Sequence, residues 1–277
     1  MKKLIGLLLT LTLLCACSNQ SNNQPSTSPT ADSGLETIVV SATAEPHATI
    51  LEFIKPVLAE KGYDLQIEIL DNFYIFNLAL NEGDVDANYF QHVVYFDKEV
   101  KEKAYDLANA GAIHIEPFGF YSPTISSLEE LQDGAKVIIS NSVADHGRLL
   151  AILEENGLIK LAEGVERSSA TVEDIEENSK NLNFIEVNPE MLASAYSNAD
   201  GDLIGINGNY AIGAGLNPNE DALLLESGEN NPYVNIVACR NGDEDSAKIQ
   251  ALVEALKSEE TQAFILEQFG GSVIPVK

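Results

Sequence analysis

The chain has 277 residues, and 43 acidic against 16 basic side chains give it a formal net charge of −27 at neutral pH. This charge excludes nucleic acid and anionic lipid headgroups as favoured partners, because both would be repelled. A hydrophobic content of 45% excludes a disordered chain. By length, the roughly 240 residues that follow the N-terminal segments suggest one large or two small domains.

The N-terminal segment has the pattern of a secretory signal peptide. Two lysines precede an apolar stretch over residues 4–14, which is shorter than the roughly 20 residues that a membrane span requires. The cysteine that follows Leu14-x-Ala16 resembles the acylated residue of the bacterial lipoprotein lipobox. We therefore expect residues 1–16 to be removed and Cys17 to carry the lipid, which would anchor the chain on a membrane surface. A plain secreted protein with a chance cysteine is the alternative.

A tether is expected to follow the lipidated residue. The sequence SNQSNNQPSTSPTADSG over residues 18–34 is rich in Ser, Asn and Pro and cannot bury apolar area. Residues 17–35 are therefore predicted to form a lipidated flexible tether.

The elements predicted for the first half alternate between strands and helices. Gly83 is expected to end one helix, and Pro56 is expected to kink another. The predicted order is a strand at 37–40, a helix at 50–58, a strand at 65–69, a short helix around 78–80, and strands at 85–90 and 112–115.

The second half continues the alternation. Ser127 carries a capping-box pattern that opens a short helix, and Gly157 is expected to stop another. Strands are predicted at 136–139, 184–187 and 203–206, and helices at 147–156, between the last two strands, and twice after residue 249. This rhythm predicts α/β layers around sheets rich in parallel strands.

Neither metal binding nor catalysis has a clear motif. The spacing of His47, His92, His114 and His146 matches no zinc pattern, and no serine lies in a Gly-x-Ser-x-Gly elbow. Cys239 stands alone in an apolar run and is expected to be buried and unreactive. We therefore expect no enzyme, no cofactor and no metal, although a metal-capture surface lipoprotein and a surface adhesin remain rival interpretations.

Two segments indicate a binding site. Residues 87–96 combine a strand end with several aromatic side chains, which suits a pocket wall for an apolar group, although core packing explains it equally well. Residues 141–148 form a polar loop that opens a helix and ends in Arg148, which suits a carboxylate, although a solvated helix cap is the alternative. Asn207 and Asn235 follow or lie in apolar strands and need partners if they are buried.

Seven motifs resemble the methionine-binding lipoproteins of bacterial ABC importers (the NlpA/MetQ family). They occur in order between about Glu36 and the C-terminus. They are PHA at 46–48, NLAL at 77–80, DANYFQH at 86–92, HIEP at 114–117, NGNYA at 207–211, GLNP at 215–218 and FGG at 269–271.

The resemblance implies an α/β, two-lobed, periplasmic-binding-protein-like fold of the type II or flytrap kind. Lobe 1 would comprise residues 36–116 and 236–277, and lobe 2 residues 117–235. The lobes would close on a free amino acid. The implied partners are an ABC permease and its ATPase, which would meet a monomeric, lipid-anchored, extracytoplasmic receptor through the rims of both lobes.

The resemblance also assigns site residues by matching positions. Arg148 would pair with the ligand carboxylate, and Asn207 and Asn235 would hydrogen-bond its polar end. The side-chain slot would be lined by Phe73, Phe90, His92 and Tyr95.

Three positions depart from the family pattern. Asp145 replaces an amide, and it would either accept the ligand ammonium or compete with the ligand carboxylate for Arg148. Phe73 stands where the family commonly has Tyr, and Phe76 where it has Pro. The ligand is therefore predicted to be L-methionine or a closely related amino acid, with a different amino acid or a short methionyl peptide as alternatives.

Overall fold

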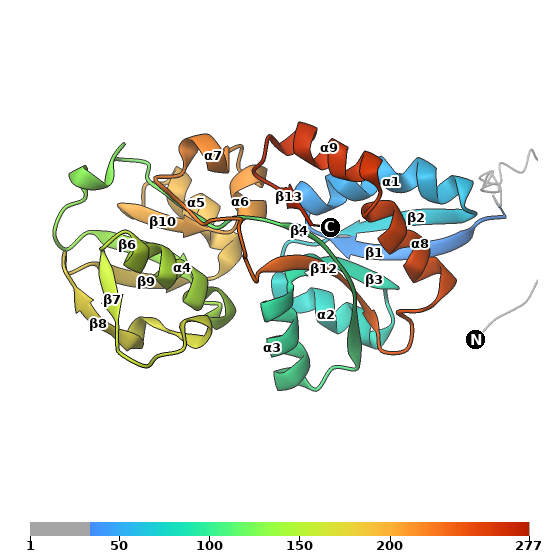
Figure 1. Ribbon diagram of the computed structural model, residues 1–277, viewed down its shortest axis with the longest axis horizontal. Coiled ribbons are helices and arrows are strands. Elements are labelled where there is room, and N and C mark those ends of the chain that lie inside the picture. The colour runs from blue at the N-terminus through green and yellow to red at the C-terminus, as the bar shows by residue number, and fades with distance from the viewer. Residues whose placement is uncertain (1–33, 277) are drawn as a thin grey trace, which may run out of the picture. The chain divides into compact units, whose positions relative to one another are not determined.

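Two main β-sheets organise residues 34–276, the part of the chain that this computed structural model describes (Figure 1). The first sheet, with its helices, is called lobe 1, and the second is called lobe 2. Across the first sheet the order of strands is β13 (Ile274–Pro275), β4 (Leu107–Ile115), β12 (Val234–Arg240), β3 (Ala87–His92), β1 (Glu36–Ala42) and β2 (Tyr63–Ile69). Across the second it is β11 (Leu224–Leu225), β5 (Gly119–Tyr121), β10 (Leu203–Ile206), β6 (Lys136–Ser140) and β9 (Asn183–Val187).

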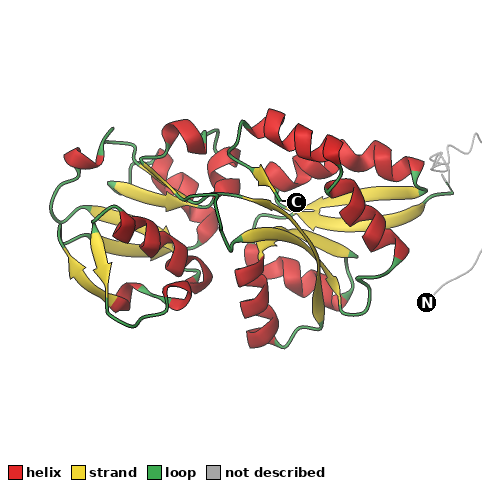
Figure 2. Ribbon diagram, viewed as in Figure 1, coloured by secondary structure: helices red, strands yellow, loops and turns green. Residues whose placement is uncertain are grey.

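Helices cover both faces of the lobe 1 sheet (Figures 1 and 2). The predicted apolar stripe of the first helix is confirmed for Ile50, Leu51, Ile54 and Leu58, which are all fully buried. Each such side chain contributes roughly 1.5–3 kcal/mol on burial. The prediction is wrong for Val57, which is exposed. One face packs against α1 (Thr49–Glu60), α8 (Ala247–Leu256) and α9 (Glu259–Phe269), and the other against α2 (Phe73–Glu82) and α3 (Val93–Lys103).

Lobe 2 carries its own helices around its sheet. Its helices are α4 (Val143–Glu155), α5 (Leu192–Ser197), α6 (Gly208–Gly213) and α7 (Pro218–Asp221), and a separate hairpin is formed by β7 (Ile159–Leu161) and β8 (Ile175–Asn178). Short helical turns are η1 (Ala44–Ala48) in lobe 1, and η2 (Leu128–Glu130), η3 (Arg167–Ser169), η4 (Val172–Asp174) and η5 (Pro189–Met191) in lobe 2. The side chain of Ser127 caps η2, as its sequence pattern predicts.

The sheets are mixed, which differs from the parallel-rich arrangement that we expect from the alternation of elements. In lobe 1, β1 pairs in parallel with β2 and β3, whereas β12 runs antiparallel to both β3 and β4. The reason is that β12 enters lobe 1 only after the chain has passed through lobe 2. No local sequence pattern reports such a return.

Two helices begin earlier than predicted. The helix expected around residues 78–80 starts at Phe73, because the side chain of Asn72 caps it by accepting the Tyr74 amide at 2.9 Å. It ends before Gly83, as predicted, where a φ of 86° favours glycine. The helix expected at 147–156 starts at Val143, so Asp145 and Arg148 both lie in its first two turns.

The aromatic segment forms part of a central strand. We predict a strand at 85–90 with the aromatic residues at and beyond its end, but β3 continues to His92 and α3 follows directly. Every residue of β3 is buried, and β1 and β12 pair with it on its two sides. Phe90 and His92 are therefore held by the sheet, and Tyr95 by the first turn of α3.

Two connections join the lobes, residues 116–118 between β4 and β5, and residues 226–233 between β11 and β12. We call them the first and second connection. The strands of the first sheet fall within 36–115 and 234–275, and those of the second within 119–225. The predicted limits of the lobes stay a prediction.

The predicted signal peptide, Cys17 and most of the predicted tether lie outside the described residues. Within residues 34–276 no helix has both the length and the apolar character of a membrane span. Cys239 is buried in β12, and burial raises the pKa of its thiol to about 12, which agrees with an unreactive group.

Candidate ligand-binding site

A cavity lies between elements of the two lobes. All eight ligand-contact residues predicted from the sequence line it, so the fold brings them together from β3, β12, α2, α3, α4 and the start of α6. The full lining consists of Phe73, Phe90, Gln91, His92, Tyr95, Glu116, Asp145, Arg148, Asn207, Gly208, Asn209 and Asn235.

Aromatic rings form one wall of the cavity. Phe90 stacks on Phe76 with a centroid separation of 4.0 Å, and Phe73 and Tyr95 lie 5.7 and 6.1 Å from Phe90. Phe73 also approaches Tyr210 of lobe 2 at 5.1 Å. Phe76 itself is fully buried behind Phe90 and is absent from the lining. This wall is shaped for an apolar group.

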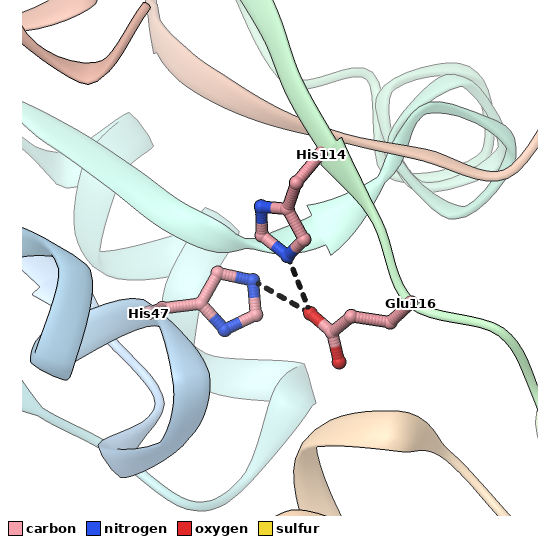
Figure 3. Close-up of side chains that lie close together, drawn as sticks. All are labelled: His47, His114 and Glu116. Carbon is pink, nitrogen blue, oxygen red and sulfur yellow. Dashed lines mark hydrogen bonds and ion pairs between the residues drawn. The ribbon is translucent and has the colours of Figure 1, made fainter. Parts of the chain in front are cut away.

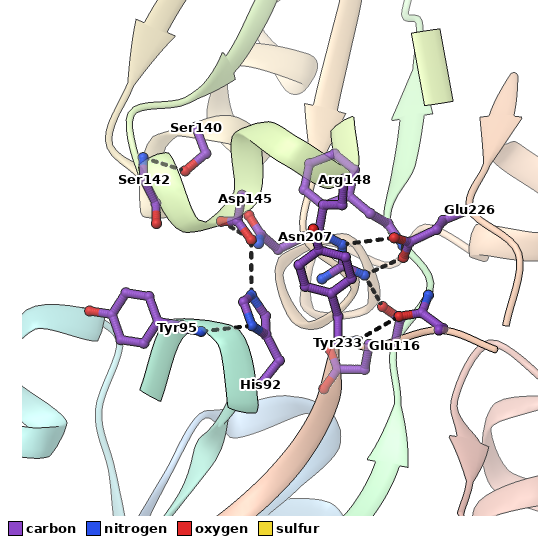
Figure 4. A network of polar contacts seen from close by, with 12 residues as sticks. His92, Tyr95, Glu116, Ser140, Ser142, Asp145, Arg148, Asn207, Glu226 and Tyr233 are labelled. Carbon is purple, nitrogen blue, oxygen red and sulfur yellow. Dashed lines mark hydrogen bonds and ion pairs between the residues drawn. The ribbon is translucent and has the colours of Figure 1, made fainter. Parts of the chain in front are cut away.

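Arg148 is held on several sides (Figure 4). Its Nε donates to Glu226 Oε1 at 3.1 Å, and its Nη2 donates to Glu226 Oε2 and to the Glu116 carbonyl, the latter at 2.9 Å. The guanidinium also lies over the ring of Tyr233, 4.4 Å from its centroid. Burial opposes the charge, but Glu226, Asp145 and Tyr233 together raise the pKa of Arg148, so the side chain stays charged.

Asp145 bridges the two lobes. Its Oδ1 accepts from His92 Nε2 at 3.1 Å, and its Oδ2 accepts from Asn207 Nδ2 at 3.1 Å (Figure 4). His92 Nδ1 accepts the Tyr95 amide, which assigns the ring proton to Nε2. Burial alone would raise the pKa of Asp145, but the hydrogen bonds from His92 and Asn207 and the charge of Arg148 lower it.

The carboxylate of Glu116 contacts two imidazole rings (Figure 3). His47 Nε2 lies 3.2 Å and His114 Nε2 2.8 Å from Glu116 Oε1, and both side chains are fully buried. Burial lowers the pKa of His47 to about 4 and that of His114 to about 3, so neither ring is charged at neutral pH. Burial also raises the pKa of Glu116.

Two histidines and a glutamate form a buried cluster that the spacing of the histidines in the sequence did not indicate. His47, His114 and Glu116 place three possible metal-ligand atoms within 4.8 Å of one another. The remaining ring nitrogens contact hydroxyl groups, His47 Nδ1 with Thr43 at 2.6 Å and His114 Nδ1 with Tyr89 at 2.5 Å. Both rings are thus fully hydrogen-bonded within the protein. The prediction that this chain holds no metal stays a prediction.

Sequence reasoning missed several residues of the site. Glu116 and the Gly208-Asn209 pair lie inside motifs that carry the family resemblance, so the signal was present but had no role attached to it. Gln91 lies in another such motif. Glu226 and Tyr233, which hold Arg148 from behind, belong to the second connection, where no periodic pattern marks them.

Comparison with known proteins identifies the family. The family model described as NlpA lipoprotein matches residues 38–277. The chain belongs to the NlpA lipoprotein family. It is 50% identical to the methionine-binding lipoprotein MetQ of Bacillus subtilis over 280 residues, which covers 100% of this chain and 99% of that relative. It is 35% identical to the D-methionine-binding lipoprotein MetQ of Escherichia coli over 226 residues, 81% of this chain and 83% of the relative.

Solved structures of NlpA-like proteins agree with this assignment. A crystal structure of a lipoprotein from Bacillus subtilis matches with a TM-score of 0.85 at 52% identity, covering 87% of this chain and 98% of the other. A nutrient binding protein from Burkholderia cenocepacia, solved bound to methionine, matches with a TM-score of 0.82 at 37% identity, covering 87% and 100%. The predicted two-lobed α/β fold is confirmed, and these relatives are named as binding proteins rather than enzymes.

Proposed function

We propose that this chain is the substrate-binding lipoprotein of an ABC importer and that it binds L-methionine or a closely related amino acid. The observation that carries the proposal is the chemistry of one cavity, which has a charged guanidinium, buried acidic groups and an aromatic wall. A zwitterion with an apolar side chain complements all three. The names of the Bacillus and Escherichia relatives and the methionine bound to the Burkholderia protein support this choice.

The carboxylate of the ligand would bind at Arg148. Among the described residues, nothing hydrogen-bonds to Nη1 of this guanidinium, while its Nε and Nη2 are already used. Asn235 offers a second donor, because its Oδ1 faces His47 Nε2 at 3.1 Å and leaves the amide nitrogen for the ligand. Charge-assisted hydrogen bonds of this kind are stronger than neutral ones.

The ammonium group would bind at the acidic side of the cavity. Asn207 Oδ1 is buried without a hydrogen-bond partner in the described part of the chain, and an ammonium N–H would satisfy it. Asp145 and Glu116 supply negative charge beside it. The neutral rings of His47 and His114 donate to Glu116, and the Asn207 amide donates to Asp145. A cationic group on the ligand would therefore stabilise both carboxylates.

The side chain of the ligand would lie against Phe73, Phe90 and Tyr95. A thioether gains roughly 0.3–1.5 kcal/mol for each favourable contact with an aromatic ring. Closure of the lobes excludes water and strengthens the polar contacts at the other end of the ligand. Binding therefore favours the closed arrangement in which the lobes already touch through Asp145 and His92.

The anchor and the partners complete the proposal. Acylation of Cys17 would hold the receptor on the outer face of the cell membrane, as a monomer. The permease and its ATPase would meet the rims of both lobes and take over the ligand. No nucleic acid is expected among the partners, because the chain is strongly acidic.

A thermal-shift panel tests the proposal. Purified protein is melted with L-methionine, D-methionine, leucine, a glycyl-methionine dipeptide and Zn²⁺. A ligand at about 100 times its dissociation constant adds about 2.7 kcal/mol to the free energy of unfolding. Methionine should stabilise the protein most. Stabilisation by zinc alone would favour metal capture at His47, His114 and Glu116, and no response to any compound would favour an adhesin.

The variant Arg148→Ala tests the assignment of the carboxylate site. Loss of one partner of a buried charge pair costs roughly 2–5 kcal/mol, so the methionine-dependent shift should disappear. A full shift in this variant would contradict the assignment of the carboxylate site.

A further inference from the structure

We infer that Glu226 is the positioning residue of the carboxylate site, which orients Arg148 toward the ligand; this inference rests on the proposed function. Glu226 is not part of the cavity lining. It lies behind Arg148, in the second connection between the lobes.

The contacts of the guanidinium leave one nitrogen for the ligand. Glu226 occupies Nε and one N–H of Nη2, and the Glu116 carbonyl takes the other N–H of Nη2. Because the guanidinium is planar and its donors have fixed directions, holding one edge fixes the direction of the opposite nitrogen. Glu226 therefore sets the direction in which Nη1 points. Nη1 has no hydrogen-bond partner among the described residues.

The aromatic rings around Arg148 restrict rotation out of this plane. The guanidinium carbon lies 4.4 Å from the centroid of Tyr233 and 5.4 Å from that of Phe118. The carboxylate of Glu226 is the group that restricts rotation within the plane. Removing it frees the guanidinium to turn while its charge remains.

Glu226 also ties the site to both connections. Its Oε2 accepts the backbone amide of Phe118 at 3.1 Å, and Arg148 itself donates to the carbonyl of Glu116. Phe118 and Glu116 belong to the first connection, and Glu226 belongs to the second. The Arg148–Glu226 pair therefore joins helix α4 to both connections, so the group that would receive the ligand carboxylate is fixed relative to the two segments that link the lobes.

Calorimetric titration with two ligands tests the inference. Methionine carries a carboxylate, and methioninol replaces it with a hydroxymethyl group but keeps the ammonium and the thioether. In Glu226→Ala the affinity for methionine should fall roughly tenfold, because the carboxylate no longer meets a directed guanidinium. The affinity for methioninol should change less than about twofold, since that ligand does not need Arg148.

Two further variants make the result specific. Glu226→Gln keeps the shape and one acceptor oxygen, so it should recover part of the methionine affinity. Glu154→Gln removes a carboxylate from the same helix as Arg148. Glu154 pairs with Arg167 at 2.6 Å and does not line the cavity, so this variant should leave both affinities unchanged. A melting curve for each variant confirms that it folds.

The outcomes separate the two proposals. Unchanged methionine affinity in Glu226→Ala, or equal losses for methionine and methioninol, would contradict the positioning role while leaving the proposed function intact. Wild-type protein that binds neither compound would contradict the proposed function and this inference with it.

Discussion

His92 and Asp145 form a direct link between the lobes at the wall of the cavity. The imidazole on β3 donates from Nε2 to the carboxylate on α4 over 3.1 Å, and both side chains are buried. Asn207, from the start of α6, donates to the other oxygen of the same carboxylate. Asp145 is therefore an acceptor shared by both lobes.

Replacing Asp145 with Asn should change the ranking of ligands. The variant loses a negative charge that disfavours a ligand carboxylate nearby, so the affinity for methionine should rise relative to methioninol. An asparagine has one side-chain oxygen, so the variant can accept from His92 or from Asn207 but not from both. A hydrogen bond to a charged group contributes about 1.5–3 kcal/mol. Calorimetric affinities for both compounds measure the change. Glu155→Gln, on the exposed end of α4, is the control, and an unchanged ranking would place Asp145 outside the ligand contacts.

Adding a methyl group at Gly208 should disturb Glu116. A Cβ at this position would lie 2.8 Å from Glu116 Cβ, closer than real Cβ contacts come, and 3.0 Å from its Oε2, which is tighter than most. Overpacking of this kind costs roughly 1–3 kcal/mol, and displacement of the carboxylate should weaken methionine binding. Thermal melts and titration measure both effects.

Gly213→Ala is the matched control for Gly208→Ala. Gly213 lies in the same helix, α6, and a Cβ there has no atom within 4 Å. This variant should bind methionine normally. Its free energy of unfolding should rise by at most about 1 kcal/mol, because alanine has the higher helix propensity. Equal binding losses in both variants would show that helix α6, rather than Glu116, is the sensitive element.

The buried His47 should make the fold sensitive to acid. Its pKa is about 4 in the folded protein against 6.5 in the unfolded chain, so between these values the unfolded chain binds a proton that the folded chain does not. The free energy of unfolding should therefore fall as the pH falls from about 6.5 to 4, by about 3 kcal/mol for this residue. The raised pKa of Glu116 acts in the opposite direction.

Urea unfolding of wild-type protein and His47→Gln at pH 7, 6, 5 and 4 measures this contribution. The difference between the two proteins reports the contribution of His47 together with its coupling to Glu116 and His114. The variant should be less stable at neutral pH but should lose less stability on acidification. Parallel curves for the two proteins would show that His47 takes up its proton equally in both states.

Cys17→Ala should release the protein from the membrane. Without the thiol no acyl chain can be attached, so radiolabelled palmitate should not be incorporated and the protein should leave the membrane fraction. Cys239→Ala removes the buried cysteine of β12 and should keep both the label and the membrane location. Membrane retention of Cys17→Ala would contradict the lipid anchor.

Several residues that line the cavity could be predicted because a local sequence pattern marks them. Arg148 follows a polar loop that opens a helix, and Phe90 and His92 lie in an aromatic strand. The same local patterns placed the strands of the core and the buried face of α1. They also misjudged the extent of α4, since Ser142 in an extended conformation starts that helix earlier than the apolar pattern does.

What the sequence could not provide was the pairing of distant groups. Glu226 reaches Arg148 from a connection whose path depends on both sheets. His47 meets His114 of β4 and Asn235 of β12, two strands that pair with each other and lie far from it in the sequence. The antiparallel entry of β12 between β3 and β4 is equally a property of the whole chain. Periodicity reports burial along one element, but it carries no information on which elements become neighbours.

The central strand β3 has a consequence for how selectivity can change in this family. Its amide protons are shielded by strands on both sides, and they should be among the last to exchange with deuterium in the whole receptor. One half of the binding surface is thus a rigid template whose backbone cannot be reshaped without unfolding the sheet. New specificities have to arise through side-chain replacement on this template, or through loops and helix ends of the opposite lobe, such as the first turns of α4.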